Sequence, residues 1–126
     1  EISQHEHVGL LAYSPLGFGV LTGKYLDETP KDSRLGLYGD WFTRYSDEST
    51  IEAVRKYVAL ARDHGMSPTE LSLAFVNTRP FVTSNIIGAT KMDQLKENIK
   101  SIEIKLTDQI IEQIEEIHKS NPNPAP

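Results

Sequence analysis

The hydrophobic positions of this chain of 126 residues fall into two short runs, of which the first is continuous, and several segments with helical spacing. The first run covers residues 8–13 and is closed by Ser14 and Pro15. The second covers residues 83–87, in which three polar residues precede Ile86 and Ile87, and it leads into a turn of small residues. Continuous apolar runs of this length are typical of parallel strands that are buried on both faces. We therefore expect two buried strands.

Apolar residues that recur every three or four positions predict two helices between these runs. The first begins near Ser49, where Glu52 stands at capping-box spacing, and ends at Gly65. The second begins at Ser67, which is followed by a proline and an acidic residue, and ends before the Arg-Pro pair at 79–80. Both helices carry their own start and stop signals.

Residues 22–46 keep no period, so we expect a long loop without regular structure there. A short helix over 92–99 and a final helix capped by Thr107 follow the second strand, and the proline-rich tail 121–126 is irregular. Alternating strands and helices predict an α/β fold with a parallel sheet. Two strands alone cannot close a barrel or cover both faces of a sheet, so this architecture is incomplete.

Composition excludes several classes of function. A net charge of −5 argues against nucleic acid as a partner, and no segment approaches the roughly 20 apolar residues that cross a bilayer. The absence of cysteine excludes disulfides and thiolate zinc sites and makes a cytoplasmic location the default expectation. The chain begins abruptly, without Met, as a piece of a longer chain would, although processing would give the same start. His5 and His7 have no third ligand at a sensible spacing, so we expect no metal site.

The segment after the second run is the most informative one for chemistry. Its helix N-terminus presents free N–H groups and a partial positive charge, which suit an anion, and Lys91 adds a full charge. Gln94, Glu97 and Asn98 are spaced to share one helix face and to hydrogen-bond a ligand. On the pattern alone, a capped surface helix with solvated polar residues is the more frequent explanation.

The segment after the first run is also a candidate site. Tyr13 ends a strand and is followed by a glycine-rich turn, which is where parallel barrels build their active sites. Gly17, Gly19 and Gly23 do not match the dinucleotide fingerprint, because the third glycine comes one position late. Ser14 lacks the flanking glycines of a nucleophile elbow. A core tyrosine and a tight turn explain the pattern equally well.

Matching motifs run along nearly the whole chain in order. They are Leu10–Gly19, Thr22–Leu26, Phe42–Tyr45, Leu73–Val76, Ile87–Thr90, Met92–Asn98 and the closing Pro124–Pro126. In these motifs the sequence resembles the aldo-keto reductase family, and within it the Tas-like subgroup. The resemblance implies a (β/α)8 TIM barrel that binds NADP(H) at the carboxyl ends of its strands. Residues 1–126 would be one partial domain, the C-terminal part of that barrel, with strands 7 and 8, their helices and a C-terminal extra helix.

The resemblance also implies roles for individual residues. Tyr13 would stack on the nicotinamide ring, and Lys91 beside a helix N-terminus would suit an adenosine 2′-phosphate. The residues implied to line the pyrophosphate or to fold over the cofactor are Ser14, Pro15, Leu16, Gly17, Gly19, Lys24 and Arg34. Those implied to hold the adenosine half are Gly88, Ala89, Thr90, Lys91, Gln94, Glu97 and Asn98.

The family's catalytic Asp, Tyr, Lys and His lie on earlier strands, and nothing in this sequence corresponds to them. A complete barrel would reduce aldehydes or ketones by hydride transfer from NADPH, so we expect this chain to hold the cofactor without catalysing the reaction. The alternative is a non-catalytic nucleotide-binding or protein-interaction module derived from the same fold. Such a module would pair its open strand edges with another copy of itself or with a partner.

Overall fold

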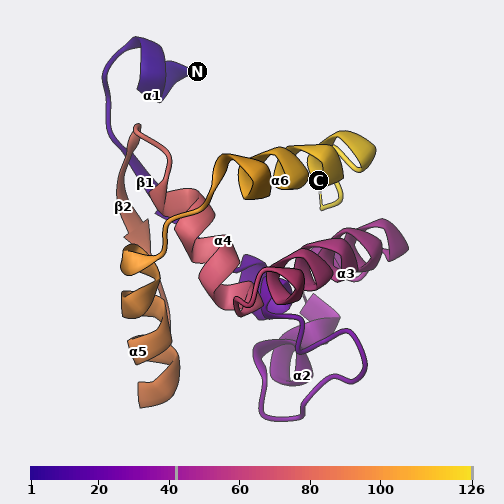
Figure 1. The fold of residues 1–126 in the computed structure, drawn as a ribbon. Coiled ribbons are helices and arrows are strands. Elements are labelled where there is room, and N and C mark those ends of the chain that lie inside the picture. The colour runs from indigo at the N-terminus through magenta and orange to yellow at the C-terminus, as the bar shows by residue number, and fades with distance from the viewer. Residues whose placement is uncertain (42, 126) are drawn as a thin grey trace.

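A computed structural model describes residues 1–41 and 43–125 of the chain. A small parallel sheet and one helix beside it form one side of the molecule, and a group of packed helices forms the other (Figure 1). A short helix, α1 (Ile2–His5), precedes the sheet. No helix among the described residues is long and apolar enough to cross a membrane.

The sheet consists of β1 (Leu10–Tyr13) and β2 (Val82–Ile86), which run parallel, with Tyr13 opposite Ile86. Both strands were predicted to within two residues. Their predicted burial is wrong, since Leu11 is 59% and Tyr13 78% exposed. The reason is that the described residues provide no third strand, so each strand has a free edge and β1 lacks a covering layer. The apolar run of β1 therefore fits a strand that is flanked and covered by other elements, which the described residues do not provide.

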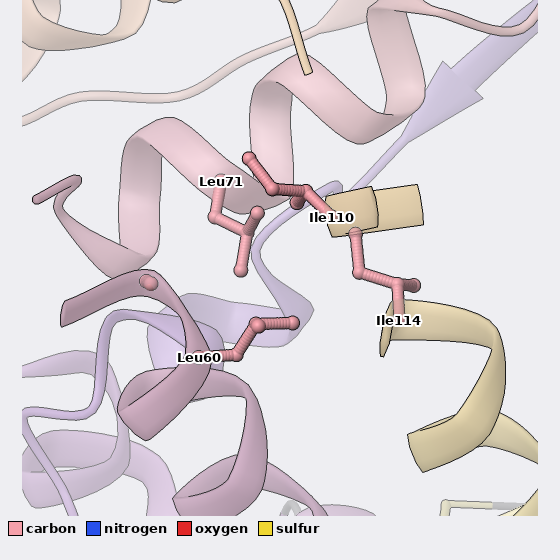
Figure 2. Packing of buried hydrophobic residues seen from close by; sticks show 5 residues of the cluster. Leu60, Leu71, Ile110 and Ile114 are labelled. Carbon is pink, nitrogen blue, oxygen red and sulfur yellow. The ribbon is translucent and has the colours of Figure 1, made fainter. Parts of the chain in front are cut away.

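The hydrophobic core lies among α3 (Glu48–Asp63), α4 (Pro68–Asn77) and α6 (Asp108–Ser120). Their apolar faces point toward one another, and burial of such side chains contributes about 1.5–3 kcal/mol each. Figure 2 shows this packing, to which α3, α4 and α6 contribute Leu60, Ala61, Leu71, Ile110 and Ile114.

Two of the three predicted N-terminal helix caps are confirmed. The Ser67 hydroxyl accepts from the Glu70 N–H at 3.0 Å, and the Glu70 carboxylate accepts from the Ser67 N–H at 2.9 Å. Thr107 caps α6 by accepting from the Ile110 N–H at 3.3 Å. Gly65, after the end of α3, has the left-handed φ of +69° that favours glycine.

The predicted capping box of Ser49 and Glu52 is wrong. The N-cap of α3 is Asp47, which makes no side-chain cap bond, and the helix begins one residue before Ser49. Both side chains have other partners, because the Ser49 hydroxyl donates to the Pro124 carbonyl and Glu52 pairs with Lys56 at 2.8 Å. A capping-box spacing that falls just inside a helix gives the same sequence signal.

Residues 22–46 are not the structureless loop that was predicted. A 3₁₀ turn, η1 (Gly17–Thr22), leads into the segment, which contains α2 (Arg34–Tyr38) and two short 3₁₀ turns, Gly39–Trp41 and Thr43–Tyr45. Apolar residues at irregular spacing anchor the segment, and this spacing hid them from a search for periodicity. Those residues, Tyr25, Leu26, Leu35 and Tyr45, pack against the buried Val20, Val54 and Val58.

The last elements follow β2. Helix α5 (Met92–Lys100) agrees with its prediction to one residue and continues into a 3₁₀ turn, Ser101–Glu103. It packs against α4 and lies beside the sheet (Figure 1). Residues 121–125 form neither helix nor strand, as predicted for this part of the tail.

Candidate functional site

The candidate site lies at the carboxyl ends of the two strands. Because β1 and β2 are parallel neighbours with Tyr13 opposite Ile86, segments 14–19 and 87–91 leave the same edge of the sheet. This edge is where ligands bind in parallel α/β folds. The structure thus brings together the two segments that the sequence marked, although they are far apart along the chain.

The turn after β1 has an unusual backbone. Gly17, Phe18 and Gly19 have φ values of +52°, +59° and +88°, all in the left-handed region. Two of the three are glycines, for which this region is open, whereas a bulky residue such as Phe18 is strained there by about 1–2 kcal/mol. Leu16 anchors the turn, since its carbonyl accepts from the N–H groups of Gly19 and Leu21 at 2.9 and 3.2 Å.

Side chains from the following segment hold Phe18 in place. The Tyr45 ring lies 5.7 Å from the Phe18 ring, and the Arg34 guanidinium lies 5.0 Å from its centroid. The sequence analysis assigned no role to Phe18 or Tyr45. The available signal was an aromatic residue between two glycines, which needs a packing partner to adopt the conformation of its neighbours.

The turn after β1 and the predicted cationic and aromatic residues around it form the first arm of the candidate site. The Tyr13 side chain is exposed at the end of β1 and is followed by Ser14 (φ +52°) and the half-buried Pro15. The Lys24 ammonium lies 4.9 Å from the centroid of the Tyr25 ring and beside Gly19, where an added Cβ would come within 3.1 Å of its Nζ. Lys24 and Arg34 therefore place positive charge around the turn.

Tyr25 links two parts of the segment 22–46, its own position and the start of α2. Its hydroxyl accepts from the Leu35 N–H at 3.3 Å. Partial burial raises the pKa of Tyr25, but hydrogen bonds from Ser33 and the Leu35 N–H, together with the charge of Lys24, outweigh it and hold the pKa below 10.0. The phenol thus fixes the start of α2, and with it Arg34, near the turn.

The second arm is the turn between β2 and α5. The Gln94 side-chain oxygen accepts from the Thr90 N–H at 3.0 Å, the Thr90 hydroxyl at 3.2 Å and the Lys91 N–H at 3.2 Å. Gln94 therefore caps its own helix and shapes the turn. Gly88, Ala89, Thr90 and Lys91 are exposed, so their backbone and the Lys91 ammonium face solvent at the mouth of the helix.

Glu97 and Asn98 lie deeper than Gln94. The Ser67 hydroxyl donates to Glu97 at 2.6 Å, which links α5 to the cap of α4. Asn98 is only 5% exposed, and its amide donates to the Gly88 carbonyl at 3.5 Å. The three predicted polar residues therefore do not form one exposed row, because Asn98 holds the turn from beneath while Gln94 caps it from outside.

One hollow adjoins the carboxyl end of β2. It has a volume of about 410 Å³, lies between β2 and α5, and is lined by Asn77, Thr83, Asn85, Ile87, Asn98 and Ser101 among others. The candidate site itself is an open surface. In residues 1–41 and 43–125, no group of three or more His, Cys, Asp or Glu side chains is placed to hold a metal ion.

Two parallel βα units that bring a glycine-rich turn and a helix N-terminus to one sheet edge define an α/β protein with a parallel sheet. The model of the Aldo/keto reductase family matches residues 1–119. The chain belongs to this family, and the resemblance seen in its motifs is confirmed.

Relatives of known name agree with this assignment. Protein tas of Escherichia coli is 51% identical over 127 residues, which cover 100% of this chain and 36% of that protein. A protein of Schizosaccharomyces pombe with the provisional name of voltage-gated potassium channel subunit beta is 37% identical, over 90% of this chain and 35% of its own length. A solved structure of a glycerol dehydrogenase from Gluconobacter oxydans superposes with a TM-score of 0.69 at 26% identity, over 99% of this chain and 38% of that one.

The chain thus spans about a third of the length of the curated relatives it matches. Its fold is α/β and corresponds to part of a (β/α)8 barrel, with two of the parallel strands and their helices. This confirms the predicted fold class. It also explains the exposed apolar residues of β1, since strands of a closed barrel have neighbours on both sides.

Proposed function

We propose that this chain is the NADP(H)-binding portion of an aldo-keto reductase, whose complete barrel reduces aldehydes or ketones by hydride transfer from NADPH. The observation that carries the proposal is the convergence of two anion-suited arms on one sheet edge. One arm is the turn Gly17–Gly19 with Lys24 and Arg34, and the other is the start of α5 with Lys91. NADP(H) carries phosphates at two separate places, which matches two arms.

The arm at α5 suits the adenosine half of the cofactor. The exposed helix start and the Lys91 ammonium offer the positive charge that a 2′-phosphate requires, and the Thr90 hydroxyl would exchange its bond to Gln94 for one to the phosphate. Gln94 and Asn98 keep this turn in shape by bonding to Thr90 and Gly88. In this proposal Gln94 and Glu97 also face the ribose and adenine. Ala89 lies in the turn between β2 and α5, beside them.

The arm at β1 suits the nicotinamide half. Tyr13 presents an exposed ring at the strand end for stacking on the nicotinamide, and the turn from Ser14 through Gly19 would line the pyrophosphate. The Leu16 carbonyl, which accepts from Gly19 and Leu21, and the fixed φ of Pro15 set the course of that turn. When bound, the cofactor supplies the hydride, while this chain's residues orient it and neutralise its phosphates.

In this proposal the catalytic Asp, Tyr, Lys and His come from the rest of the barrel, so the chain alone binds NADPH and does not reduce a carbonyl. We expect weak binding, because part of the site is contributed by the rest of the barrel. The aldehyde or ketone would bind only with the remaining strands in place.

Titration of NADPH fluorescence tests the proposal with three variants. Lys91→Ala and Gln94→Ala should each bind NADPH about fivefold to tenfold more weakly than wild type, and Lys91→Ala should lose little affinity for NADH, which has no 2′-phosphate. Lys105→Ala removes an exposed lysine outside the candidate site and serves as the matched control. Equal NADPH binding by wild type, Lys91→Ala and Gln94→Ala would overturn the assignment.

A second candidate function, a protein-interaction module, is favoured by the exposed apolar residues of the sheet. Leu11, Tyr13 and Ile86 are 59%, 78% and 50% exposed, and both strands have a free edge. Such edges pair readily with another chain. Light scattering discriminates here, since a stable monomer at high concentration would contradict this function and leave NADP(H) binding untouched.

A further inference from the structure

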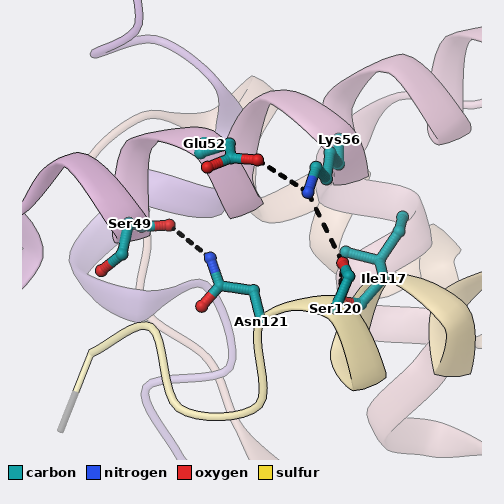
Figure 3. A network of polar contacts seen from close by, with 6 residues as sticks. All are labelled: Ser49, Glu52, Lys56, Ile117, Ser120 and Asn121. Atoms are coloured by element: carbon teal, nitrogen blue, oxygen red, sulfur yellow. Dashed lines mark hydrogen bonds and ion pairs between the residues drawn. The ribbon is translucent and has the colours of Figure 1, made fainter.

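The C-terminal tail lies across the first turn of α3. The Asn121 side-chain amide donates to the Ser49 carbonyl at 2.8 Å (Figure 3). Farther along the tail, the Pro124 carbonyl accepts from two hydroxyls of the same helical turn, those of Ser49 and Thr50. Thr50 is only 4% exposed, so the tail covers this hydroxyl. The tail is therefore attached to α3 at both of its ends.

The tail also contacts the segment just before α3. Arg44 donates from Nε to the Ala125 carbonyl at 3.0 Å, and its guanidinium lies 5.9 Å from the centroid of the adjacent Tyr45 ring. Tyr45 is the residue that packs on Phe18, and its ring would also be 3.6 Å from a Cβ placed at Gly17. A continuous series of contacts thus joins the tail to the turn after β1.

We propose that residues 121–125 form a strap that holds the turn Gly17–Gly19 in its binding shape, through Arg44 and Tyr45. This inference rests on the proposed function, in which that turn lines the pyrophosphate. Arg44 and Thr50 are positioning residues, since they act on the turn through other residues. The strap therefore sets the affinity for the nicotinamide half of the cofactor and leaves the adenosine half unaffected.

The backbone strain at Phe18 explains why the turn needs support from the strap. Phe18 keeps a left-handed backbone only as long as its ring has a partner, because an unsupported bulky residue leaves this region. One of its partners, Tyr45, lies on a 3₁₀ turn of three residues, Thr43–Tyr45, which is too short to be rigid by itself. The hydrogen bond from Arg44 to the tail fixes this short turn against α3.

Two variants remove the strap, and one serves as the control. Arg44→Met deletes the donor to Ala125 while keeping an apolar stem, and a chain ending at Ser120 lacks the whole tail. The control, Lys56→Met, deletes the 3.5 Å contact of Lys56 with Ser120 and its pairing with Glu52 (Figure 3). Like the strap, this contact links α3 to the C-terminal region, but it does not involve residues 121–125.

The ligand test compares NADPH with 2′-AMP, which carries only the adenosine half. Both strap variants should bind NADPH about threefold to tenfold more weakly, while 2′-AMP binding by all variants and both affinities of Lys56→Met stay within about 1.5-fold of wild type. Equal weakening for NADPH and 2′-AMP would overturn the strap, because a general loss of structure affects both halves. Unchanged NADPH binding by the strap variants would overturn it as well.

Hydrogen exchange without ligand separates the strap from the proposed function. The N–H groups of Gly19 and Leu21 both donate to Leu16, so their exchange rates report the shape of the turn. Both strap variants should exchange these two amides about threefold to tenfold faster, with amides at the end of α4 unchanged. Unchanged exchange rates in the strap variants would contradict the strap, whether or not wild type binds NADPH. Absence of NADPH binding by wild type would contradict only the proposed function.

Discussion

The helical side and the sheet side of this molecule differ in how completely their apolar side chains are buried. In the helical side, Leu73 and Ala61 have no exposed surface, and α3, α4 and α6 enclose a common core. On the sheet side, Leu11 and Tyr13 are mostly exposed and each strand has one partner. The comparison separates two tasks: the helices hold the chain together, and the strand ends carry the candidate site while adding little stability.

The largest expected effect tests this division by removing one leucine from each side. Leu73→Ala should lower the free energy of unfolding by about 3 kcal/mol, because it leaves a cavity in a filled core. Leu11→Ala should change the same free energy by less than about 0.5 kcal/mol, because the side chain is already 59% exposed. Urea denaturation followed by circular dichroism measures both. Equal losses would show that the sheet side is as tightly packed as the helices.

A smaller effect comes from the caps that orient the core helices. Ser67→Ala should cost about 1–2 kcal/mol, because it removes the acceptor for the Glu70 N–H and the donor to Glu97. Ser49→Ala is the matched control, since Ser49 lies near a helix start without capping it, and its loss should stay below about 0.5 kcal/mol. A loss for Ser49→Ala as large as that for Ser67→Ala would contradict this difference between a capping and a non-capping serine.

The smallest expected effect is a difference in alkaline pH dependence between two tyrosines. Burial, with the nearby charge of Glu115, raises the pKa of Tyr57 above 10.0, so the stability this phenol contributes is complete below about pH 10 and is lost as the pH rises through the folded pKa. The pKa of Tyr25 is lowered, so its contribution grows as the pH rises from the folded pKa toward 10.0.

Replacement of each phenol by phenylalanine should therefore change the alkaline loss of stability in opposite directions. Tyr57→Phe should flatten the fall in the urea midpoint between about pH 9 and pH 11, and Tyr25→Phe should steepen it. The midpoint at pH 7 of each variant serves as its own reference. A change of the same sign in both variants would contradict the opposite pKa directions.

The sequence predicted best those elements whose signals are local. Ser67 and Thr107 announced their helices because a cap is a contact between near neighbours. The burial of β1 was predicted wrongly, since an apolar run reports the neighbours for which a strand is built, and the described chain supplies only β2. Residues 22–46 were read as a loop because their anchors, such as Tyr25 and Tyr45, follow no period.

The candidate site shows the same limit. The motifs marked both strand ends, and the parallel register brings these ends together. The motifs did not show that Gln94 caps its own helix, that Glu97 bonds to Ser67 or that Tyr45 supports Phe18. These contacts join segments that are distant in sequence or depend on side-chain rotamers, which residue spacing does not encode. The roles of these residues toward NADP(H) remain predictions.

The most direct test of the central claim is hydrogen exchange of wild type with and without saturating NADPH. If the two strand ends hold one cofactor, NADPH should slow exchange in both arms, at residues 16–21 and 88–94, while amides in the middle of α6 stay unchanged. The account predicts protection of both arms at the same NADPH concentration. Protection of neither arm, or of one arm alone at saturation, would contradict it.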